Sequence, residues 1–214
     1  MEMQFIKEFV GSIVKNKDMP KVQVEREISP ILEMFIEGFM NELAKNGKIR
    51  EGRYKFIAPE FPLSNVDNND RSVNIDFLLL NTDTNTFYFV ELNTDSSSFK
   101  LEQYQYYVDV INNKSSSELY DFLGGLKNVK YKNYKDMINI TEEQFKSIKE
   151  IELLYIAPKR LTVPNKRRKE EAREALKNIN FITFEDLDTF NNIDSKYDEI
   201  WKEITPILLA LDKN

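Results

Sequence analysis

Apolar and polar residues recur along the chain in two periods, which predict helices and strands. Spacings of three and four positions predict a helix over 4–15 and a second over 28–43. In the second helix, Ser29-Pro30 suits the N-cap and first helical position, and Asn46-Gly47 suits the end. The chain is therefore expected to begin with two helices.

Three strands are predicted next, at 54–63, 73–80 and 86–92. Prolines mark the end of the first of these strands. The connector NTDTNT between the other two has the composition of a turn. We therefore expect the second and third strands to form an antiparallel hairpin.

The second half of the chain is predicted to alternate helices with strands. An almost continuous apolar run at 151–157 is typical of a strand buried on both faces, as in parallel pairing. The other elements expected are an amphipathic helix over 97–112, loops over 113–150 with a helix from Thr141 capped by Glu143 or Gln144, a basic helix over 165–178, a strand over 180–184 and a helix over 194–211. This order predicts an α/β protein.

Size and composition narrow the classes of protein. The 214 residues, 41% hydrophobic and 31% charged, suit one globular domain over 1–214. The chain has no cysteine and no histidine, which excludes disulfides, zinc fingers and cysteine or serine–histidine catalysis. Carboxylates must then carry any chemistry, and as hard oxygen donors they favour Mg²⁺ or Mn²⁺.

No signal peptide or membrane span is expected. The first sixteen residues contain two acids and no long apolar stretch. No later segment approaches the roughly 20 apolar residues of a membrane span. We therefore expect a cytoplasmic protein with no membrane partner.

Positive charge is unevenly distributed although the net charge is −6. One run contains only lysines as charged residues, and the segment from Lys159 to Arg173 holds seven basic residues against two acids. Both segments suit contacts to phosphates, with solvated loops and a charged helix face as the alternative. The residues concerned are Lys127, Lys130, Lys132 and Lys135 in the first run, and Lys159, Arg160, Lys166, Arg167 and Arg168 in the second.

Two acids are expected to meet on the hairpin. Pairing about a turn centred near Asp83-Thr84 places Asp76 opposite Glu91. Burying two neighbouring carboxylates among apolar residues is costly unless a cation or a proton intervenes. A divalent metal resolves the repulsion, and the carbonyl of Leu92 adds a third oxygen. The alternative is that both acids lie on a solvent-exposed strand edge.

The segment NIDFLLL, a turn and then FYFVELNTD resemble the D…(D/E)-x-K core of PD-(D/E)XK nucleases. Gln103-x-x-x-Tyr107 resembles the Q-x-x-x-Y of RecB-like branches of that superfamily. The resemblance implies a restriction-endonuclease-like fold, with an antiparallel three-stranded meander and a parallel strand between helices. It also implies that Asp76 and Glu91 bind the metal and that Gln103 and Tyr107 line the substrate side. Core packing is the alternative for Tyr107.

The chain departs from this motif at its third position, where Asn93 replaces the lysine. An amide can orient a water or donate to a phosphate oxygen, but it carries no charge. Lys100 is a candidate to supply the positive charge of the absent motif lysine. The alternative is that Lys100 is an ordinary solvated residue of the helix. The resemblance also admits an extra acid from the first helices, and Glu27 and Glu33 are the candidates.

These residues imply metal-dependent hydrolysis of phosphodiester bonds in nucleic acid, with DNA as the expected partner and activity weakened by Asn93. A catalytically inactive binding or interaction module of the same fold is the second hypothesis. A generic α/β protein whose motif similarity arose by chance is the third. For Asn93 itself, an inactivating substitution is the alternative to one that only weakens activity.

Overall fold

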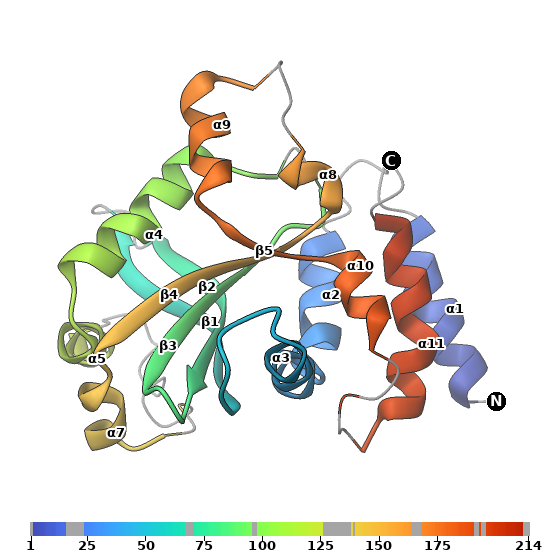
Figure 1. Cartoon of the computed structure of the whole chain (residues 1–214), viewed down its shortest axis with the longest axis horizontal. Coiled ribbons are helices and arrows are strands. Elements are labelled where there is room, and N and C mark those ends of the chain that lie inside the picture. Colours follow the sequence, from blue (N-terminus) through green and yellow to red (C-terminus); the bar gives the residue numbers. More distant parts are fainter. Residues whose placement is uncertain are drawn as a thin grey trace. The chain divides into compact units, whose positions relative to one another are not determined.

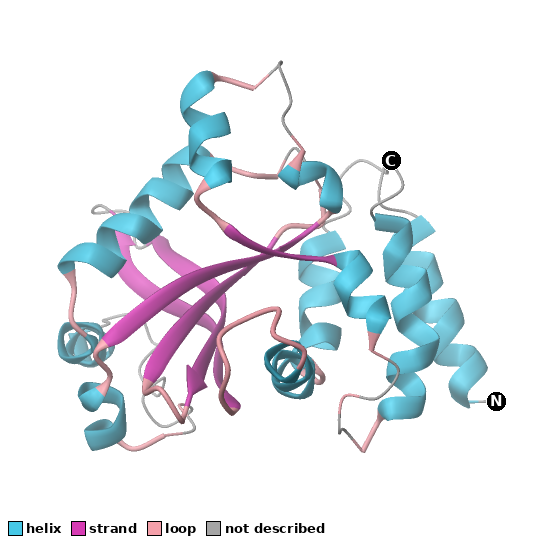
Figure 2. Cartoon of the chain, in the orientation of Figure 1, coloured by secondary structure: helices cyan, strands magenta, loops and turns pink. Residues whose placement is uncertain are grey.

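The computed structural model is an α/β structure in which five strands form one mixed sheet, flanked by helices (Figures 1 and 2). The strand order is β1-β2-β3-β4-β5. The structure describes residues 2–15, 24–66, 71–95, 98–125, 138, 140–163, 168–190, 193 and 196–211. The predicted fold class, α/β with a mixed sheet, is confirmed at this level.

The chain divides into two compact units. The first comprises Met1–Glu51, Leu92–Phe99 and Tyr155–Asn214, and the second comprises Gly52–Glu91 and Lys100–Leu154. Each unit is described by itself below. That the chain is a single domain over 1–214 stays a prediction.

The second unit contains the predicted hairpin. Strands β2 (Arg71–Asn81) and β3 (Thr86–Leu92) pair antiparallel, with Phe77 opposite Val90. Every residue of β3 is buried, because the strand is almost wholly apolar. The hairpin and its register are confirmed.

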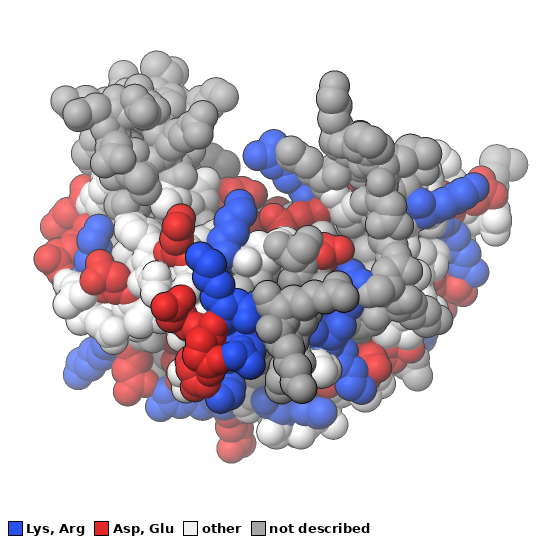
Figure 3. Space-filling view, turned by 90° about the horizontal axis from the view of Figure 1, so that it is seen from above, with Lys and Arg blue, Asp and Glu red and all other residues white. Residues whose placement is uncertain are grey.

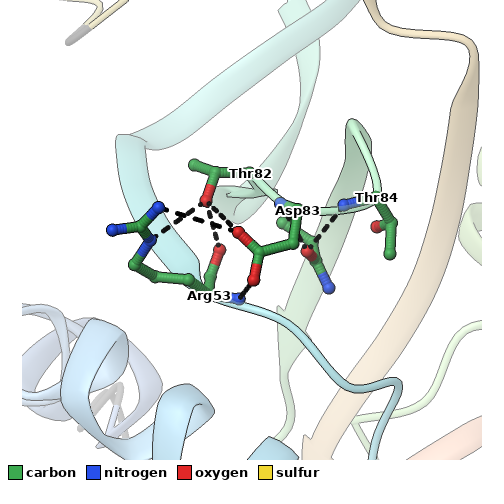
Figure 4. Close-up of polar contacts among 5 residues, drawn as sticks. Arg53, Thr82, Asp83 and Thr84 are labelled. Atoms are coloured by element: carbon green, nitrogen blue, oxygen red, sulfur yellow. Dashed lines mark hydrogen bonds and ion pairs between the residues drawn. The ribbon is translucent and has the colours of Figure 1, made fainter.

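A polar network closes the turn between β2 and β3 (Figure 4). The Asn81 Oδ1 accepts hydrogen bonds from the backbone N–H groups of Asp83 and Thr84 at 3.1 and 3.2 Å. The backbone N–H of Arg53 donates to Asp83 Oδ2 at 3.2 Å, and the Thr82 hydroxyl donates to the Arg53 carbonyl at 3.1 Å. Side chains that bind backbone groups in this way fix the turn and, with it, the strand register.

Strand β1 (Tyr54–Val66) is longer than predicted. Pro59 and Pro62 were expected to mark its end, but both lie within it. Two features permit this: β1 is an edge strand, and its register shifts between Phe56 and Ala58 and between Pro62 and Ser64. Proline is tolerated at an edge and beside a bulge because no ladder hydrogen bond is lost there.

Helix α4 (Leu101–Asn113) begins four residues later than expected, and α5 (Ser116–Gly125) lies where loops were predicted. Ser115 and Glu118 form the hydrogen bonds of a capping box before α5, a signal present in the sequence. The helix predicted from Thr141 is observed as α7 (Glu142–Ser147). Thr141 is its N-cap residue and forms a capping box with Gln144.

The first unit holds most of the helices that the structure describes. Strand β4 (Glu150–Ala157) continues from the second unit into the first, and the segment at 151–157 is a strand as predicted. The other elements of this unit are α1 (Glu2–Lys15), α2 (Val24–Glu33), α3 (Ile36–Lys45), α8 (Lys159–Thr162), α9 (Glu170–Lys177), β5 (Asn180–Thr183), α10 (Phe184–Thr189), α11 (Asp198–Leu208) and the 3₁₀ turn Leu209–Leu211.

The single helix predicted over 28–43 is two helices. Helix α2 begins at Val24, so Pro30 lies inside it rather than at its first position. The chain then breaks at Met34 and Phe35, whose N–H groups bond to carbonyls three residues back. The missing N–H of Pro30 affects the turn before it, so it does not explain the break at Met34 and Phe35, and the apolar period continues across the break. The predicted stop at Asn46-Gly47 is confirmed.

The structure differs from the predictions at two helices near the C-terminus. The basic helix expected over 165–178 is observed as α9, and residues 164–167 lie outside the described part. Helix α10 was not predicted, although Thr183 and Asp186 form a capping box at its start. No helix among the described residues has the length and apolar character needed to cross a membrane.

Alanine is expected to change the free energy of unfolding in opposite directions at two helical glycines of the first unit. A Cβ at Gly38 would lie 2.2 Å from the Ile193 carbonyl oxygen, whereas no described atom lies within 4 Å of one at Gly11. We expect Gly38→Ala to lower the free energy of unfolding by at least about 1 kcal/mol through overpacking. Gly11→Ala, the matched control, should raise it by up to about 1 kcal/mol through helix propensity. Urea denaturation measures both, and equal effects would contradict the predicted contact.

Candidate functional site

A buried carboxylate defines the candidate site in the second unit. Glu91 lies near the end of the apolar strand β3 and is only 5% exposed. Its Oε1 accepts a hydrogen bond from Gln103 Nε2 at 2.9 Å, and its Oε2 accepts one from the Tyr107 hydroxyl at 2.7 Å. Both oxygens of the buried acid are therefore held by side chains of one helix.

Helix geometry explains why these two side chains act together. Gln103 and Tyr107 are four positions apart on α4, so they lie on the same helix face. Gln103 Nε2 is also 2.5 Å from the Tyr107 oxygen. The Tyr107 hydroxyl has one proton and two acceptors in reach, Glu91 Oε2 and the Asn74 carbonyl at 2.8 Å. These four residues form a network that joins β2, β3 and α4.

Asp76 lies beside this network. One step beyond the Phe77 and Val90 pair, the register sets Asp76 opposite Glu91, as predicted. Directly opposed residues of an antiparallel pair share a face, with Cβ atoms about 4.5–5.5 Å apart. Asp76 is partly exposed, whereas Glu91 is buried. The structure thus joins Glu91, Gln103 and Tyr107 by hydrogen bonds, and the hairpin register, continued by one pair, sets Asp76 across from Glu91.

The donor set is compatible with a hard divalent cation. Both carboxylate oxygens of Glu91 already accept hydrogen bonds, from Gln103 and from Tyr107, so a cation would share these oxygens with them. Asp76 adds a second carboxylate on the same face. Within the described part of the chain, no three Asp, Glu, His or Cys side chains form a metal-binding group. A cation here would therefore keep several waters, as Mg²⁺ usually does.

Three further candidates lie around the motif. Leu92 and Asn93 belong to the first unit, where the Asn93 N–H donates to the Ile156 carbonyl at 2.8 Å. Asn93 is 3% exposed, and its Oδ1 has no hydrogen-bond partner among the residues that the structure places. Lys100 is exposed and immediately precedes α4. No hydrogen bond or ion pair described here links Lys100 to Glu91.

The two candidate acids of the first unit differ in environment. Glu27 is exposed, in the first turn of α2. Glu33, at the end of the same helix, is partly buried, and this burial raises the pKa of its carboxyl above its ordinary value. Both lie in the first unit, and their part in a metal site stays a prediction.

Several of the predicted phosphate contacts are engaged with protein groups. Arg160 pairs with Asp95 at 3.0 Å, and Lys159 with Glu185 at 2.6 Å. Arg168 donates to the Leu161 carbonyl at 3.1 Å, and burial lowers the pKa of its guanidinium. The face seen in Figure 3 carries both signs of charge close together. Lys166, Arg167 and the lysines at 127, 130, 132 and 135 lie outside the described residues.

Sequence reasoning missed two residues of the second unit that adjoin the site. The Asn74 carbonyl oxygen lies 2.8 Å from the Tyr107 hydroxyl as its second acceptor in reach, and the Asn74 Nδ2 donates to Glu60 Oε2 at 3.4 Å. Glu60 is an acid inside an apolar strand, and this was a usable signal. Asn74 gave a weaker sequence signal, because it is a polar residue two positions before Asp76 in the same predicted strand.

Comparison with known proteins gives no match: no family model, no curated protein and no solved structure is similar to this chain. The case for a function therefore depends on the residues and their geometry alone.

Proposed function

We propose that this protein is a metal-dependent nuclease-like hydrolase of the PD-(D/E)XK superfamily with a restriction-endonuclease-like fold. The observation that supports it best is the buried Glu91, bound by Gln103 and Tyr107 and set opposite Asp76. A buried carboxylate is costly unless its hydrogen bonds are satisfied. A purely structural strand needs neither this acid nor its two partners.

In this proposal Asp76 and Glu91 would hold Mg²⁺ or Mn²⁺. The bound ion would supply Lewis acidity and a water of lowered pKa for attack on a phosphodiester. Gln103 and Tyr107 orient Glu91 and line the substrate side. Asn93, in place of the motif lysine, offers an amide to water or phosphate but no charge, so hydrolysis is slow.

Nucleic acid, with DNA as the expected substrate, would be bound through its phosphates. Lys159, Arg160 and Arg168 remain the described candidates, together with Lys166 and Arg167. Contacts of this kind give affinity that falls with salt and depends little on sequence.

An inactive binding module of the same fold is the second proposal. The neutral Asn93 and the carboxylate partners of Lys159 and Arg160 favour it, because each reduces the positive charge available to a phosphate. This module would keep the carboxylate site without hydrolysing its ligand.

Calorimetric titration of Mn²⁺ into the wild type, Asp76→Ala and Asp109→Ala tests the proposal, with a nuclease assay on single- and double-stranded DNA alongside. Asp109 is an exposed acid of α4 and serves as the control. Binding that only Asp76→Ala abolishes, with cleavage, supports the nuclease and makes Asn93→Lys the next variant. Binding without cleavage supports the inactive module, and no binding by the wild type rejects the metal site.

A further inference from the structure

We propose that Arg160 binds a phosphate group through two N–H groups of its guanidinium, and that Asp95 occupies this cation until a phosphate displaces it. The inference rests on the phosphate contacts of the proposed function. It adds Asp95 to them as the group that limits binding at Arg160. Both residues belong to the first unit.

The chain segments that follow β3 and β4 are adjacent in this unit. The N–H of Asn93 donates to the Ile156 carbonyl at 2.8 Å, so the chain after β3 is tied to the end of β4. Asp95 comes two residues after Asn93, and Arg160 comes four residues after Ile156, in α8. An ion pair joins the two segments, because Arg160 Nη2 lies 3.0 Å from Asp95 Oδ2.

The guanidinium of Arg160 is only partly used by this ion pair. Asp95 accepts from Nη2, whereas Nε is buried and has no hydrogen-bond partner among the residues that the structure describes. Arginine has five N–H donors in a fixed planar arrangement, and a single bond to one carboxylate oxygen leaves most of them unused. A buried donor is rarely left without an acceptor, so Nε indicates an acceptor that the described residues do not supply.

A phosphate group has the acceptors that this guanidinium lacks. The Nε–H and one N–H of Nη2 point to the same side of the guanidinium plane, and two phosphate oxygens can accept both bonds in parallel. Such bidentate, charge-assisted pairs are stronger than hydrogen bonds between neutral groups. Because the phosphate needs the Nη2 group that Asp95 holds, the two anions compete for one cation.

The carboxylate of Asp95 is the partner that can leave. Its side chain is 50% exposed, against 25% for Arg160, and an ion pair with a half-exposed partner contributes little to stability. The backbone of Asp95 is held separately, because the N–H and the hydroxyl of Ser98 donate to its carbonyl at 3.1 and 2.6 Å. The carboxylate can therefore turn away from Arg160 without a change in this turn.

Fluorescence anisotropy of a labelled single-stranded oligo(dT), measured with EDTA present, tests the inference without depending on catalysis. Asp95→Asn keeps the shape of the side chain and removes its charge, and we expect the affinity for DNA to rise about threefold. Arg160→Gln should lower the affinity about tenfold, because a hydrogen-bonded charge is lost. Glu199→Gln is the matched control: it removes the same charge from the exposed pair of Glu199 and Lys202 on α11, and it should leave the affinity unchanged.

Two further variants separate the exchange at Arg160 from a general effect of charge. In the double variant of Asp95→Asn and Arg160→Gln, the gain from Asp95→Asn should disappear, because no guanidinium is left to release. Arg160→Lys keeps the charge but lacks the planar pair of donors, so its affinity should also fall below that of the wild type. Equal affinities for Arg160→Lys and the wild type would overturn the bidentate contact. Circular dichroism of each variant establishes that it is folded.

The outcomes separate this inference from the proposed function. If DNA binds but Asp95→Asn behaves like Glu199→Gln, or if its gain persists without Arg160, the role of Asp95 is overturned and the nucleic-acid proposal stands. Calorimetric titration of inorganic phosphate into the same variants gives the second comparison. A gain that depends on Arg160 for phosphate, without DNA binding by any variant, supports the inference and rejects nucleic acid as the ligand. No gain in Asp95→Asn with either probe overturns the inference.

Discussion

Replacing Tyr107 by phenylalanine is expected to lower the free energy of unfolding by about 2 kcal/mol. The Tyr107 side chain is fully buried, and its hydroxyl binds Glu91 Oε2 and the Asn74 carbonyl. Phenylalanine keeps the ring but leaves a buried carboxylate oxygen without its donor, and hydrogen bonds to charged groups contribute about 1.5–3 kcal/mol. Urea denaturation followed by circular dichroism measures the change.

A double-mutant cycle with Glu91→Gln provides the control for this prediction. If Tyr107 and Glu91 stabilise the fold through each other, the two effects will be non-additive by more than about 0.5 kcal/mol. Additive effects would contradict the network at the candidate site.

A larger loss of stability is expected in the first unit for Trp201→Ala, about 4 kcal/mol. Trp201 is fully buried, and its ring lies 5.2 Å from that of Phe35 and 5.6 Å from that of Phe39. Its Nε1 donates to the Phe190 carbonyl at 2.9 Å. Truncating a buried tryptophan leaves a cavity and typically costs about 3–5 kcal/mol.

The measurement is thermal and urea unfolding by circular dichroism, because Trp201 is the one tryptophan of the chain and its fluorescence disappears with it. Trp201→Phe is the matched variant: it keeps an aromatic ring, loses the bond to Phe190 and should cost clearly less. Similar losses for the two variants would show that the hydrogen bond, and not the packing, carries the stability.

Local patterns predicted the elements whose period was uninterrupted. The hairpin of β2 and β3 and the strand at 151–157 followed from alternation, an apolar run and a turn sequence. Errors arose where a local signal had two meanings. Pro30 was taken as a helix start and the β1 prolines as a strand end, but edge position and bulges allow proline inside β1. Helices α5 and α10 carried capping boxes that were overlooked.

By itself the sequence determined the hairpin register, and with it the opposition of Asp76 and Glu91, because a short turn leaves little freedom in pairing. It also restricted any chemistry to carboxylates, since cysteine and histidine are absent. The resemblance to Q-x-x-x-Y named Gln103 and Tyr107 for this site, but only the tertiary structure decided that both side chains hydrogen-bond the buried carboxylate of Glu91. Gln103 is 12 and Tyr107 16 residues from Glu91, and Asn74 is 33 from Tyr107. Contacts over such separations depend on how α4 packs on the sheet, and this packing has no local sequence signal.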